Sequence, residues 1–203
     1  MTKERLLRLI EKYKPLGMEY VPETGAILIG RAPHIGPEAW LNSMYDTVSE
    51  GDVEEMEQSM GRKIPSQYRD FLLSCSNGLN IVSTSLCLFG QRKMVGRDIV
   101  ASRQPFDLVT LNRYKSERPR NASSDSFFFG GYDWDGSQVY FSCDGKVHFC
   151  APDDSKSLRE WDSLDDFLIS KIHRIHSLFD DNGVELDDSN PTIPVPSNTS
   201  GYS

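Results

Sequence analysis

Residues 56–72 have the sequence MEQSMGRKIPSQYRDFL and are followed closely by Asn77-Gly78. Gly61 can adopt the left-handed backbone that ends a helix. Pro65 forbids a continuous helix and pushes the residue before it, Ile64, into an extended conformation. Pro65 or Ser66 can then open a second helix. The stretch therefore predicts a helix, a tight loop and another helix.

The second predicted helix carries one apolar stripe. Its members share helical spacing and are Ile64, Tyr68, Phe71, Leu72 and Cys75. Asn77-Gly78 is a stop and turn pattern. None of these residues forms a chemical motif, so the pattern favours a core role for Tyr68, Phe71 and Leu72.

The same residues, in this order and spacing, resemble the N-terminal signature of the SUKH superfamily. A second block, from Phe129-Gly130 through Asp133-Trp134-Asp135-Gly136 to Trp161, agrees with it. The resemblance covers roughly residues 50 to 175 and implies a mixed sheet flanked by helices. The signature positions, for which we expect structural roles, are Glu57, Gly61, Ile64, Pro65, Tyr68, Phe71, Leu72, Asn77, Gly78, Gly130, Gly136, Asp144 and Gly145.

The order of elements along the chain indicates an α+β fold with a mixed, largely antiparallel sheet flanked by helices. We expect helices before residue 75, a meander of strands after it, and a final helix. The expected helical segments are 3–14, 38–45, 53–60 with Asp52 as its cap, and 164–179. The expected strands are 26–29, 79–83, 86–89, 126–131, 139–143 and 146–151, with a hairpin turn at Asp144-Gly145.

The length of 203 residues favours one domain, which we place at residues 1–186. Residues 187–203 are rich in Pro, Ser, Thr and Asn, and this composition predicts a disordered polar tail. No apolar stretch is long enough to span a membrane, and the N-terminus has the pattern of an amphipathic helix. We therefore expect a cytoplasmic protein whose four cysteines are reduced and mostly buried.

The net charge of −8 is spread unevenly. Residues 121–203 hold 15 acidic and 5 basic side chains, which leaves −10, whereas residues 92–120 hold 8 basic and 3 acidic ones, which leaves +5. An acidic surface repels nucleic acid and attracts basic proteins. Solubility alone explains the acidity equally well, so both interpretations stay open.

Candidate catalytic and metal-binding residues are few. His173 and His176 are spaced for metal binding on a helix, but no third ligand accompanies them. The segment 133–136 resembles the start of a calcium loop, but it lacks the glutamate that completes one, and a turn is favoured. The basic segment 113–120 is compatible with nucleic-acid contact, and a flexible solvated loop is favoured. We expect no catalytic residue, no metal and no cofactor.

The sequence therefore predicts a non-catalytic protein-binding module. The resemblance implies an immunity protein that binds a cognate protein toxin, such as a basic nuclease, with no direct contact to nucleic acid or membrane. The alternative is an intracellular scaffold or regulator of the cell-wall-synthesis-regulator type. The candidate contact residues are Asp153, Asp154, Asp162, Asp165 and Asp166, with Trp161 as an aromatic anchor. For Trp161 a place in the core is favoured, and the acids are also compatible with helix capping.

Overall fold

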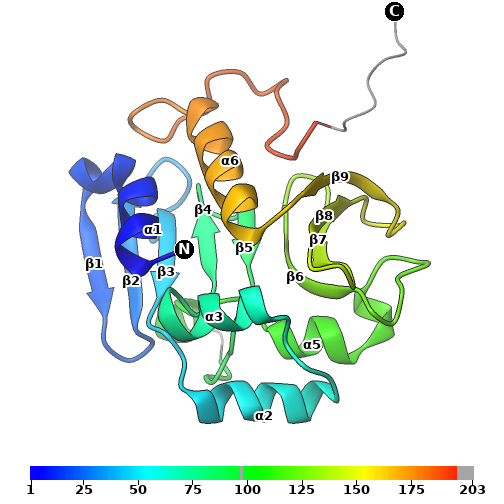
Figure 1. Ribbon diagram of the computed structural model, residues 1–203. Coiled ribbons are helices and arrows are strands. Elements are labelled where there is room, and N and C mark those ends of the chain that lie inside the picture. The colour runs from blue at the N-terminus through cyan, green and yellow to red at the C-terminus, as the bar shows by residue number, and fades with distance from the viewer. Residues whose placement is uncertain (97, 196–203) are drawn as a thin grey trace, which may run out of the picture.

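The computed structural model describes residues 1–96 and 98–195, which form a nine-stranded sheet with helices on both faces (Figure 1). The strands follow one another in chain order across the sheet, and every pairing between them is antiparallel. They are β1 (Met18–Val21), β2 (Ala26–Arg31), β3 (Trp40–Tyr45), β4 (Leu79–Ile81), β5 (Leu86–Leu88), β6 (Phe127–Gly131), β7 (Gln138–Phe141), β8 (Val147–Cys150) and β9 (Ser157–Trp161). The predicted α+β class is confirmed.

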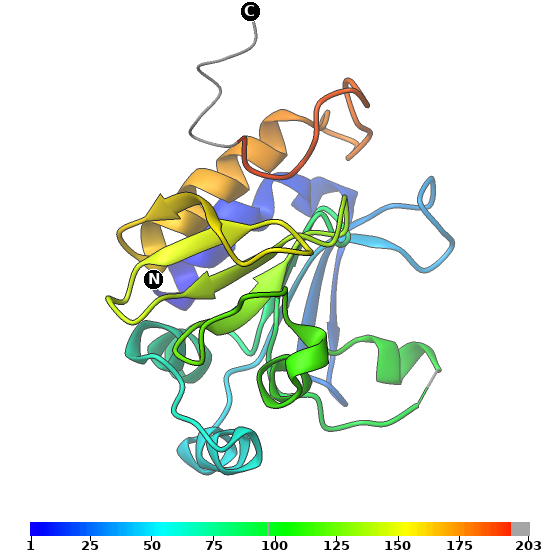
Figure 2. The same ribbon diagram turned by 90° about the vertical axis from the view of Figure 1, so that its right-hand side faces the viewer.

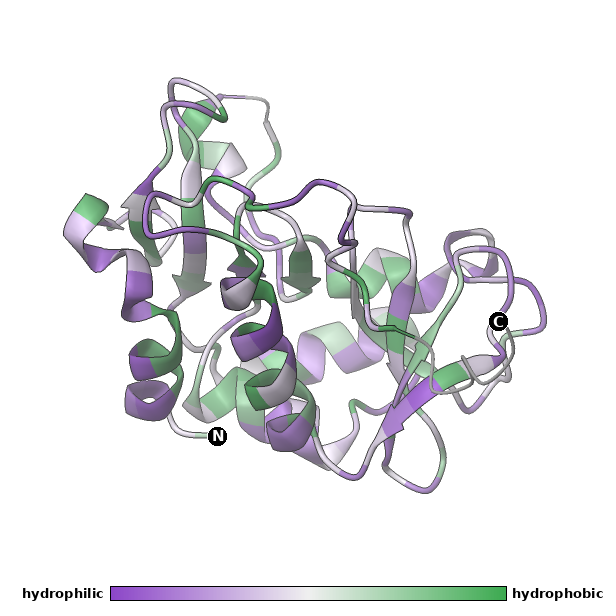
Figure 3. Ribbon diagram, turned by 90° about the horizontal axis from the view of Figure 1, so that it is seen from above, coloured by the Kyte–Doolittle hydropathy of each residue, from purple (hydrophilic) through white to green (hydrophobic). Residues whose placement is uncertain are grey.

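Six α-helices and two short 3₁₀ helices join or cover the strands. They are α1 (Lys3–Ile10), η1 (Glu11–Leu16), α2 (Glu50–Met60), α3 (Ser66–Ser74), α4 (Ile99–Ser102), α5 (Leu108–Arg113), η2 (Lys115–Glu117) and α6 (Leu164–Ser177). Hydrophilic residues lie on the outer sides of the helices and hydrophobic ones face inwards (Figure 3). This is the division expected for amphipathic helices on a core.

One face of the sheet is covered by α1, α3 and α6, whereas the segment from α4 to α5 lies on the opposite side (Figure 2). The covered face holds the main hydrophobic core, to which α1 contributes Leu6 and Ile10 and α6 contributes Phe167 and Ile172. The strands supply alternate residues, such as Val139 and Phe141 from β7, as a period of two requires.

The second face of the sheet carries only two small apolar clusters. One lies on the first three strands and contains Val21, Leu28 and Tyr45. The other joins α5 to β6, β7 and β8 through Leu111, Phe128, Tyr140 and Cys150. The basic stretch between β5 and β6 therefore covers part of this face through α5, whereas most of the segment 113–120, predicted as a solvated loop, is exposed. Its Pro119 is buried.

Three of the expected elements are corrected. The segment 38–45 contains strand β3 (Trp40–Tyr45) rather than helical turns. The residues of this strand are buried on both faces, so the sequence lacks the alternation that marks a strand. The edge strands β1 and β9 were not predicted, because their side chains are largely exposed. Ser49 rather than Asp52 is the N-cap of α2; Asp52 is its partner in a capping box.

The C-terminal segment continues along the core. Arg174 in α6 donates a hydrogen bond to the carbonyl oxygen of Pro191 (2.7 Å), and the nearby Thr192 and Pro194 are buried. The predicted disordered tail at 187–203 includes residues 196–203, which lie outside the described residues. The boundary at residue 186 stays a prediction. None of the described helices has the length and apolar character that a bilayer crossing requires.

Candidate functional site

A hollow of about 250 Å³ opens on the second face, at the centre of the sheet. Strands β5, β6 and β7 form its floor with Cys87, Gly131 and Gln138, and the segment between β5 and α5 forms one wall with Phe89 and Phe106. We call this feature the central hollow. It is mainly apolar, and it lies where the segment from α4 to α5 leaves the sheet uncovered.

Glycines at the end of β6 create the space for the central hollow. Gly131 pairs with Cys87 on one side and Gln138 on the other, so it places no side chain on the floor between them. A methyl group on the preceding residue, Gly130, would collide with the carbonyl oxygen of Cys87. The close approach of β5 and β6 therefore requires glycine at this signature position.

The turn that follows β6 forms the rim of the central hollow. Asp133 accepts a hydrogen bond from the Thr84 hydroxyl, and Asp135 Oδ1 accepts one from the Ser137 amide (2.9 Å). The side chain of Trp134, between these two acids, is 46% exposed. The turn predicted at 133–136 is confirmed, with Gly136 at φ +78°. It presents an aromatic ring flanked by two carboxylates to solvent.

The opposite wall presents a second exposed aromatic ring. Phe106 is 46% exposed and packs against Phe89, with 5.4 Å between ring centroids. Hydrogen bonds between the backbones of Phe106, Leu108 and Gly90 fix this wall to the end of β5. The buried Asn112 then fixes α5 to β6, because its amide both donates to and accepts from the Phe128 backbone.

The chemistry of the central hollow favours binding over catalysis. Cys87 is the thiol that lines the hollow, and burial, assisted by Asp133, raises the pKa of this thiol far above its usual range. The thiol is therefore neutral and poorly nucleophilic. No histidine lines the hollow to act as its base. Exposed aromatic rings beside carboxylates suit an apolar side chain that carries or adjoins a positive charge.

The acidic residues predicted to contact a partner are split into two groups. Asp153 and Asp154 precede β9, whereas Asp162, Asp165 and Asp166 follow it. Strand β9 has five residues, so its length places roughly 13 Å between the groups. The structure does not bring them into one cluster.

Each acid of the second group already has a partner within the chain. Asp162 lies 3.3 Å from the Lys146 ammonium, and Asp165 lies 2.7 Å from the N-terminal amine of Met1. Asp166 accepts a hydrogen bond from Ser163, the N-cap of α6, at 2.6 Å. The Asp166 contact matches the capping role that the sequence left open, whereas Asp162 and Asp165 form ion pairs.

The remaining acids and Trp161 have structural contacts too. Asp153 lies 3.6 Å from Arg120, with both side chains exposed, and Asp154 accepts a hydrogen bond from the Lys156 amide. Trp161 is buried and packs edge-on against Phe167, with 5.0 Å between ring centroids. Trp161 is therefore a core residue, and its role as an anchor for a partner has no exposed surface to support it.

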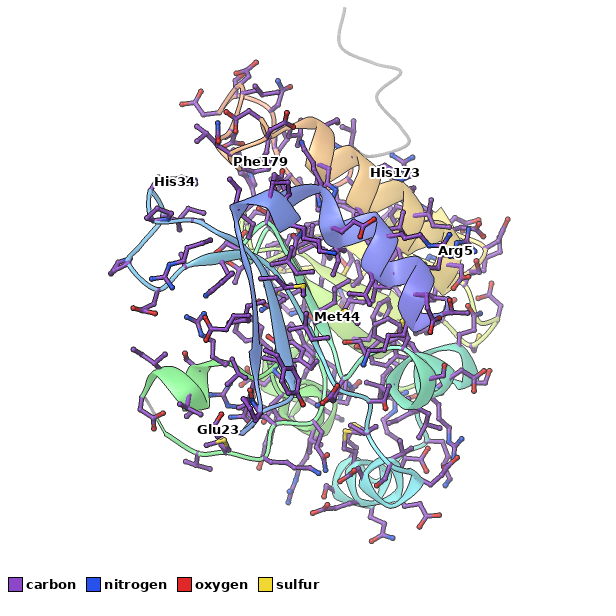
Figure 4. All side chains as sticks on the ribbon, turned by 90° about the vertical axis from the view of Figure 1, so that its left-hand side faces the viewer. Arg5, Glu23, His34, Met44, His173 and Phe179 are labelled. Carbon is purple, nitrogen blue, oxygen red and sulfur yellow. The ribbon has the colours of Figure 1, made fainter. Side chains whose placement is uncertain are left out.

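The two histidines of α6 point in different directions. His173 is exposed on the outer side of the helix (Figure 4), whereas His176 is buried against Tyr13. Burial, and then the nearby Lys12, lower the pKa of His176 to about 4. In the part of the chain that the structure describes, no three His, Cys, Asp or Glu side chains are grouped to hold a metal ion.

The four cysteines form no disulfide in the described residues. Cys75, Cys87 and Cys150 are buried and Cys143 is exposed. This agrees with the prediction that most of the cysteines are buried.

The N-terminal signature residues tie helices α2 and α3 together. Gly61 has the left-handed backbone that ends α2, and Pro65 is the N-cap of α3. The buried Glu57 bridges the loop between them, because its carboxylate accepts hydrogen bonds from the Ile64 amide (3.0 Å) and the Lys63 ammonium (2.5 Å). The predicted helix–loop–helix is confirmed.

Other signature residues tie α3 to the sheet. The buried Tyr68 donates its hydroxyl to the backbone carbonyls of Phe89, directly after β5, and Phe129, in the middle of β6. Asn77 exchanges two hydrogen bonds with the backbone of Gln91. Phe71 and Leu72 lie in the main core, as predicted.

The remaining signature residues are turn and contact positions. A methyl group on Gly78 (φ +96°) would press on the Leu88 carbonyl oxygen and Pro105. Asp144 and Gly145 form the predicted turn between β7 and β8, where Gly145 accepts a hydrogen bond from Gln67 of α3. Gly78, Asp144 and Gly145 therefore hold turns and contacts around the sheet, whereas the signature residue Gly136 lines the central hollow.

Sequence reasoning did not identify Phe106 and Trp134 as surface residues. Aromatic residues are usually buried, and the pattern around them gives no sign of their exposure. Only the pairing of β6 with both β5 and β7 brings these two segments to one hollow.

Comparison with known proteins identifies the family of the chain. The sequence model of the SMI1 / KNR4 family (SUKH-1) matches residues 47–170, which include α2, α3, the central hollow and the start of α6. Comparison with curated proteins gives no significant match. The matched region covers more than half of the 203 residues. The chain therefore belongs to the SMI1/KNR4 (SUKH-1) family of the SUKH superfamily.

Proposed function

We propose that this chain is a non-catalytic, cytoplasmic protein-binding module that acts as an immunity protein and neutralises a cognate protein toxin by direct binding. The family supports a binding role on a common fold. The observation that carries the proposal is the central hollow, which is lined by the exposed Phe106 and by Asp133, together with the exposed Trp134 in the turn at its rim. Aromatic side chains at a concave surface are the usual anchors of protein interfaces.

The charge around the central hollow indicates a basic partner. Asp133 and Asp135 flank Trp134, and the chain as a whole carries a net charge of −8. A basic toxin such as a nuclease would be drawn to such a surface, because opposite charges accelerate encounter. Salt screens exposed charges beyond about 8 Å at physiological ionic strength, so association should slow as salt rises.

The test is co-expression of the chain with the toxin encoded beside its gene, followed by cell survival and the affinity of the purified pair. Trp134→Ala should weaken binding by about 30-fold, the effect of removing an interface anchor worth about 2 kcal/mol. Met18→Ala removes an apolar side chain that is more exposed (57%) from edge strand β1 and should bind normally.

The charge is tested by a matched pair of double variants. Asp133→Asn with Asp135→Asn should slow association, since Asn keeps the turn's hydrogen-bond acceptors without their charge. Glu19→Gln with Glu23→Gln removes the same charge at β1 and its turn (Figure 4) and should leave the association rate unchanged. Full protection and full affinity in the hollow variants would remove this surface from the interface.

The acidic residues around β9 are tested in the same assay. If Asp162, Asp165 and Asp166 contact the toxin, their joint replacement by Asn should weaken binding, and Trp134→Ala should leave it unchanged. Failure of the unmodified chain to protect against any neighbouring toxin would favour the alternative, a scaffold or regulatory protein.

A further inference from the structure

A second concave surface, separate from the central hollow, lies between the end of α2 and the segment that follows α5. It is a groove of about 660 Å³. Its cationic lining residues are Arg62, Arg113, Lys115, Arg118 and Arg120, and no carboxylate lines it. We call this feature the basic groove. Five cations in one groove are unexpected in a chain whose net charge is −8.

Most of these cations have no acidic partner. Arg120 lies 3.6 Å from Asp153, and both side chains are largely exposed. Among residues 1–96 and 98–195, no carboxylate lies within 4.0 Å of the side-chain nitrogens of Arg62, Arg113, Lys115 or Arg118. By contrast, many cations elsewhere, such as Lys146, are paired. The positive charge of the basic groove is therefore left for a ligand.

The side chain of Arg62 is held in place within the basic groove. Arg62 donates hydrogen bonds to the backbone carbonyls of Ser126 (2.9 Å) and Asp125 (3.3 Å), and its guanidinium lies over the Phe127 ring. These contacts fix the side chain without neutralising it. A preorganised cation loses less entropy on binding an anion than a flexible one does.

Two guanidinium groups of the basic groove lie in electrostatically unfavourable surroundings. Burial and the nearby Arg118 both lower the pKa of Arg62, so the two charges repel each other. The Nε–H of Arg118 is buried and has no acceptor in the described part of the chain. A bound anion would relieve the repulsion and could supply the missing acceptor.

The donor set suits phosphate. Four of the five cations are arginines, whose planar fork matches the oxygens of a phosphate group. Ser116, Asn121 and Ser124 add hydroxyl and amide groups to the lining, and Met60 and Ala122 add an apolar patch. The volume lies in the range of small-molecule sites.

We propose that the basic groove binds a small ligand that carries several phosphate groups in series, such as a nucleoside polyphosphate or inorganic polyphosphate. Such a ligand brings three or four charges into a short length, which matches the density of cations here. A long nucleic acid is disfavoured, because residues 121–203 carry a net charge of −10 and would repel it outside the groove. This binding is distinct from toxin neutralisation.

The test is isothermal titration of the purified full chain with tripolyphosphate and, separately, with ATP. We expect saturable binding of one ligand per chain that weakens as salt rises. Equal affinity for the two would assign the contacts to the phosphates, and tighter binding of ATP would add the apolar patch as a nucleoside subsite. No saturable binding of either would overturn the proposal.

Matched variants locate the site. Arg113→Gln and Arg118→Gln should each weaken binding at least tenfold, whereas Arg8→Gln and Lys156→Gln remove the same charge from exposed positions elsewhere and should change it little. Lys115→Gln alters only an exposed side chain, so a loss of affinity there cannot be due to misfolding. Equal affinity in the groove and control variants would overturn the proposal.

Two further probes separate phosphate from other polyanions. If a poly-glutamate peptide or a single-stranded RNA oligonucleotide binds at the groove and the polyphosphates do not, the proposal is wrong and the groove recognises a carboxylate segment or nucleic acid. Toxin protection by Arg113→Gln should stay complete, so failure of this proposal leaves the proposed function unaffected.

Discussion

The two faces of the sheet differ in what covers them. The face under α1, α3 and α6 is sealed by one continuous core, in which residues such as Tyr68 and Phe167 are fully buried. The other face is covered in part by the segment from α4 to η2, and there Phe106 lines the central hollow and is exposed, as is Trp134 in the turn at the rim.

The difference separates what defines the fold from what can vary with function. The signature residues of the N-terminal block, among them Glu57, Tyr68 and Asn77, satisfy backbone groups or bridge elements and present no group to a ligand. Both concave surfaces described above lie outside the sealed face. A family signature of this kind identifies a fold, and evidence for function has to come from the residues of the second face.

The sharpest way to break this comparison is to truncate one phenylalanine on each face. Phe71→Ala should lower the free energy of unfolding by about 3–5 kcal/mol, because it leaves a cavity in the sealed core. Phe106→Ala, on the open face, should lower it by less than about 1 kcal/mol. Urea unfolding measures both.

Equal losses for the two variants would contradict the distinction between the faces. A loss below about 1 kcal/mol for Phe71→Ala would place that side chain outside the core. The slope of unfolding with urea should be unchanged in both variants, which shows that the denatured state is the same reference for each.

Local chemistry made the sealed face predictable from sequence. Gly61 and Pro65 mark a helix end and a helix start by their own backbone limits, and Asp144-Gly145 marks a hairpin in the same way. Strand β3 could not be predicted, because its side chains are buried on both faces of the sheet. This burial removes the alternation of apolar and polar residues from its sequence.

The open face was not predictable, since exposure is a tertiary property. The pattern at 133–136 indicated a turn correctly, but nothing in it shows that Trp134 faces solvent while Tyr132, two residues earlier, is buried against Phe149. The basic groove was hidden for the same reason. Arg62 joins the cations of the 113–120 segment only through the packing of α2 against α5.

A buried lysine on the sealed face gives the second prediction. Lys171 of α6 is almost completely buried and lies 5.0 Å from the centre of the Trp161 ring. Burial, and then the nearby Arg159 and Arg174, lower its pKa to about 8. Lys171→Met should therefore raise the free energy of unfolding at pH 7 by about 1–2 kcal/mol, after a discount for the solvent that still reaches the ammonium.

The pH dependence of the same variant has a definite sign. Between pH 8 and the ordinary lysine value of 10.5, the unfolded chain binds a proton at Lys171 that the folded chain has lost. Stability from this group therefore rises with pH across that window. The stability gain of Lys171→Met over the unmodified chain should shrink between pH 8 and pH 10.5, whereas Lys156→Met, at an exposed site, should show no such trend. A constant gain would contradict the lowered pKa.

The third prediction concerns the C-terminal segment that lies along α6. Its composition alone predicts that everything after Asp187 is dispensable for folding. The burial of Thr192 and Pro194, and the hydrogen bond from Arg174 to Pro191, predict instead that truncation after Asp187 costs about 1–2 kcal/mol. Truncation after Val195 keeps all of these contacts and serves as the comparison. Thermal unfolding of the two truncated chains compares these directly, and an unchanged midpoint in both would support composition over contacts.

The smallest expected effect separates helix capping from partner binding in the acids around α6. Asp166→Ala should cost about 0.5–1 kcal/mol, since it removes the carboxylate that orients the N-cap Ser163 and interacts with the helix dipole. Asp162→Ala should cost less than about 0.5 kcal/mol, because its ion pair with Lys146 is exposed and Lys146 keeps its second partner, Glu160. Urea unfolding at low and high salt distinguishes them, as only the charge contributions fall with salt.

Asn at positions 162, 165 and 166 keeps the hydrogen-bond acceptors, so that triple variant should retain nearly full stability. A loss of toxin binding in a variant of undiminished stability would then assign these acids to the interface, and unchanged binding would leave them to the fold.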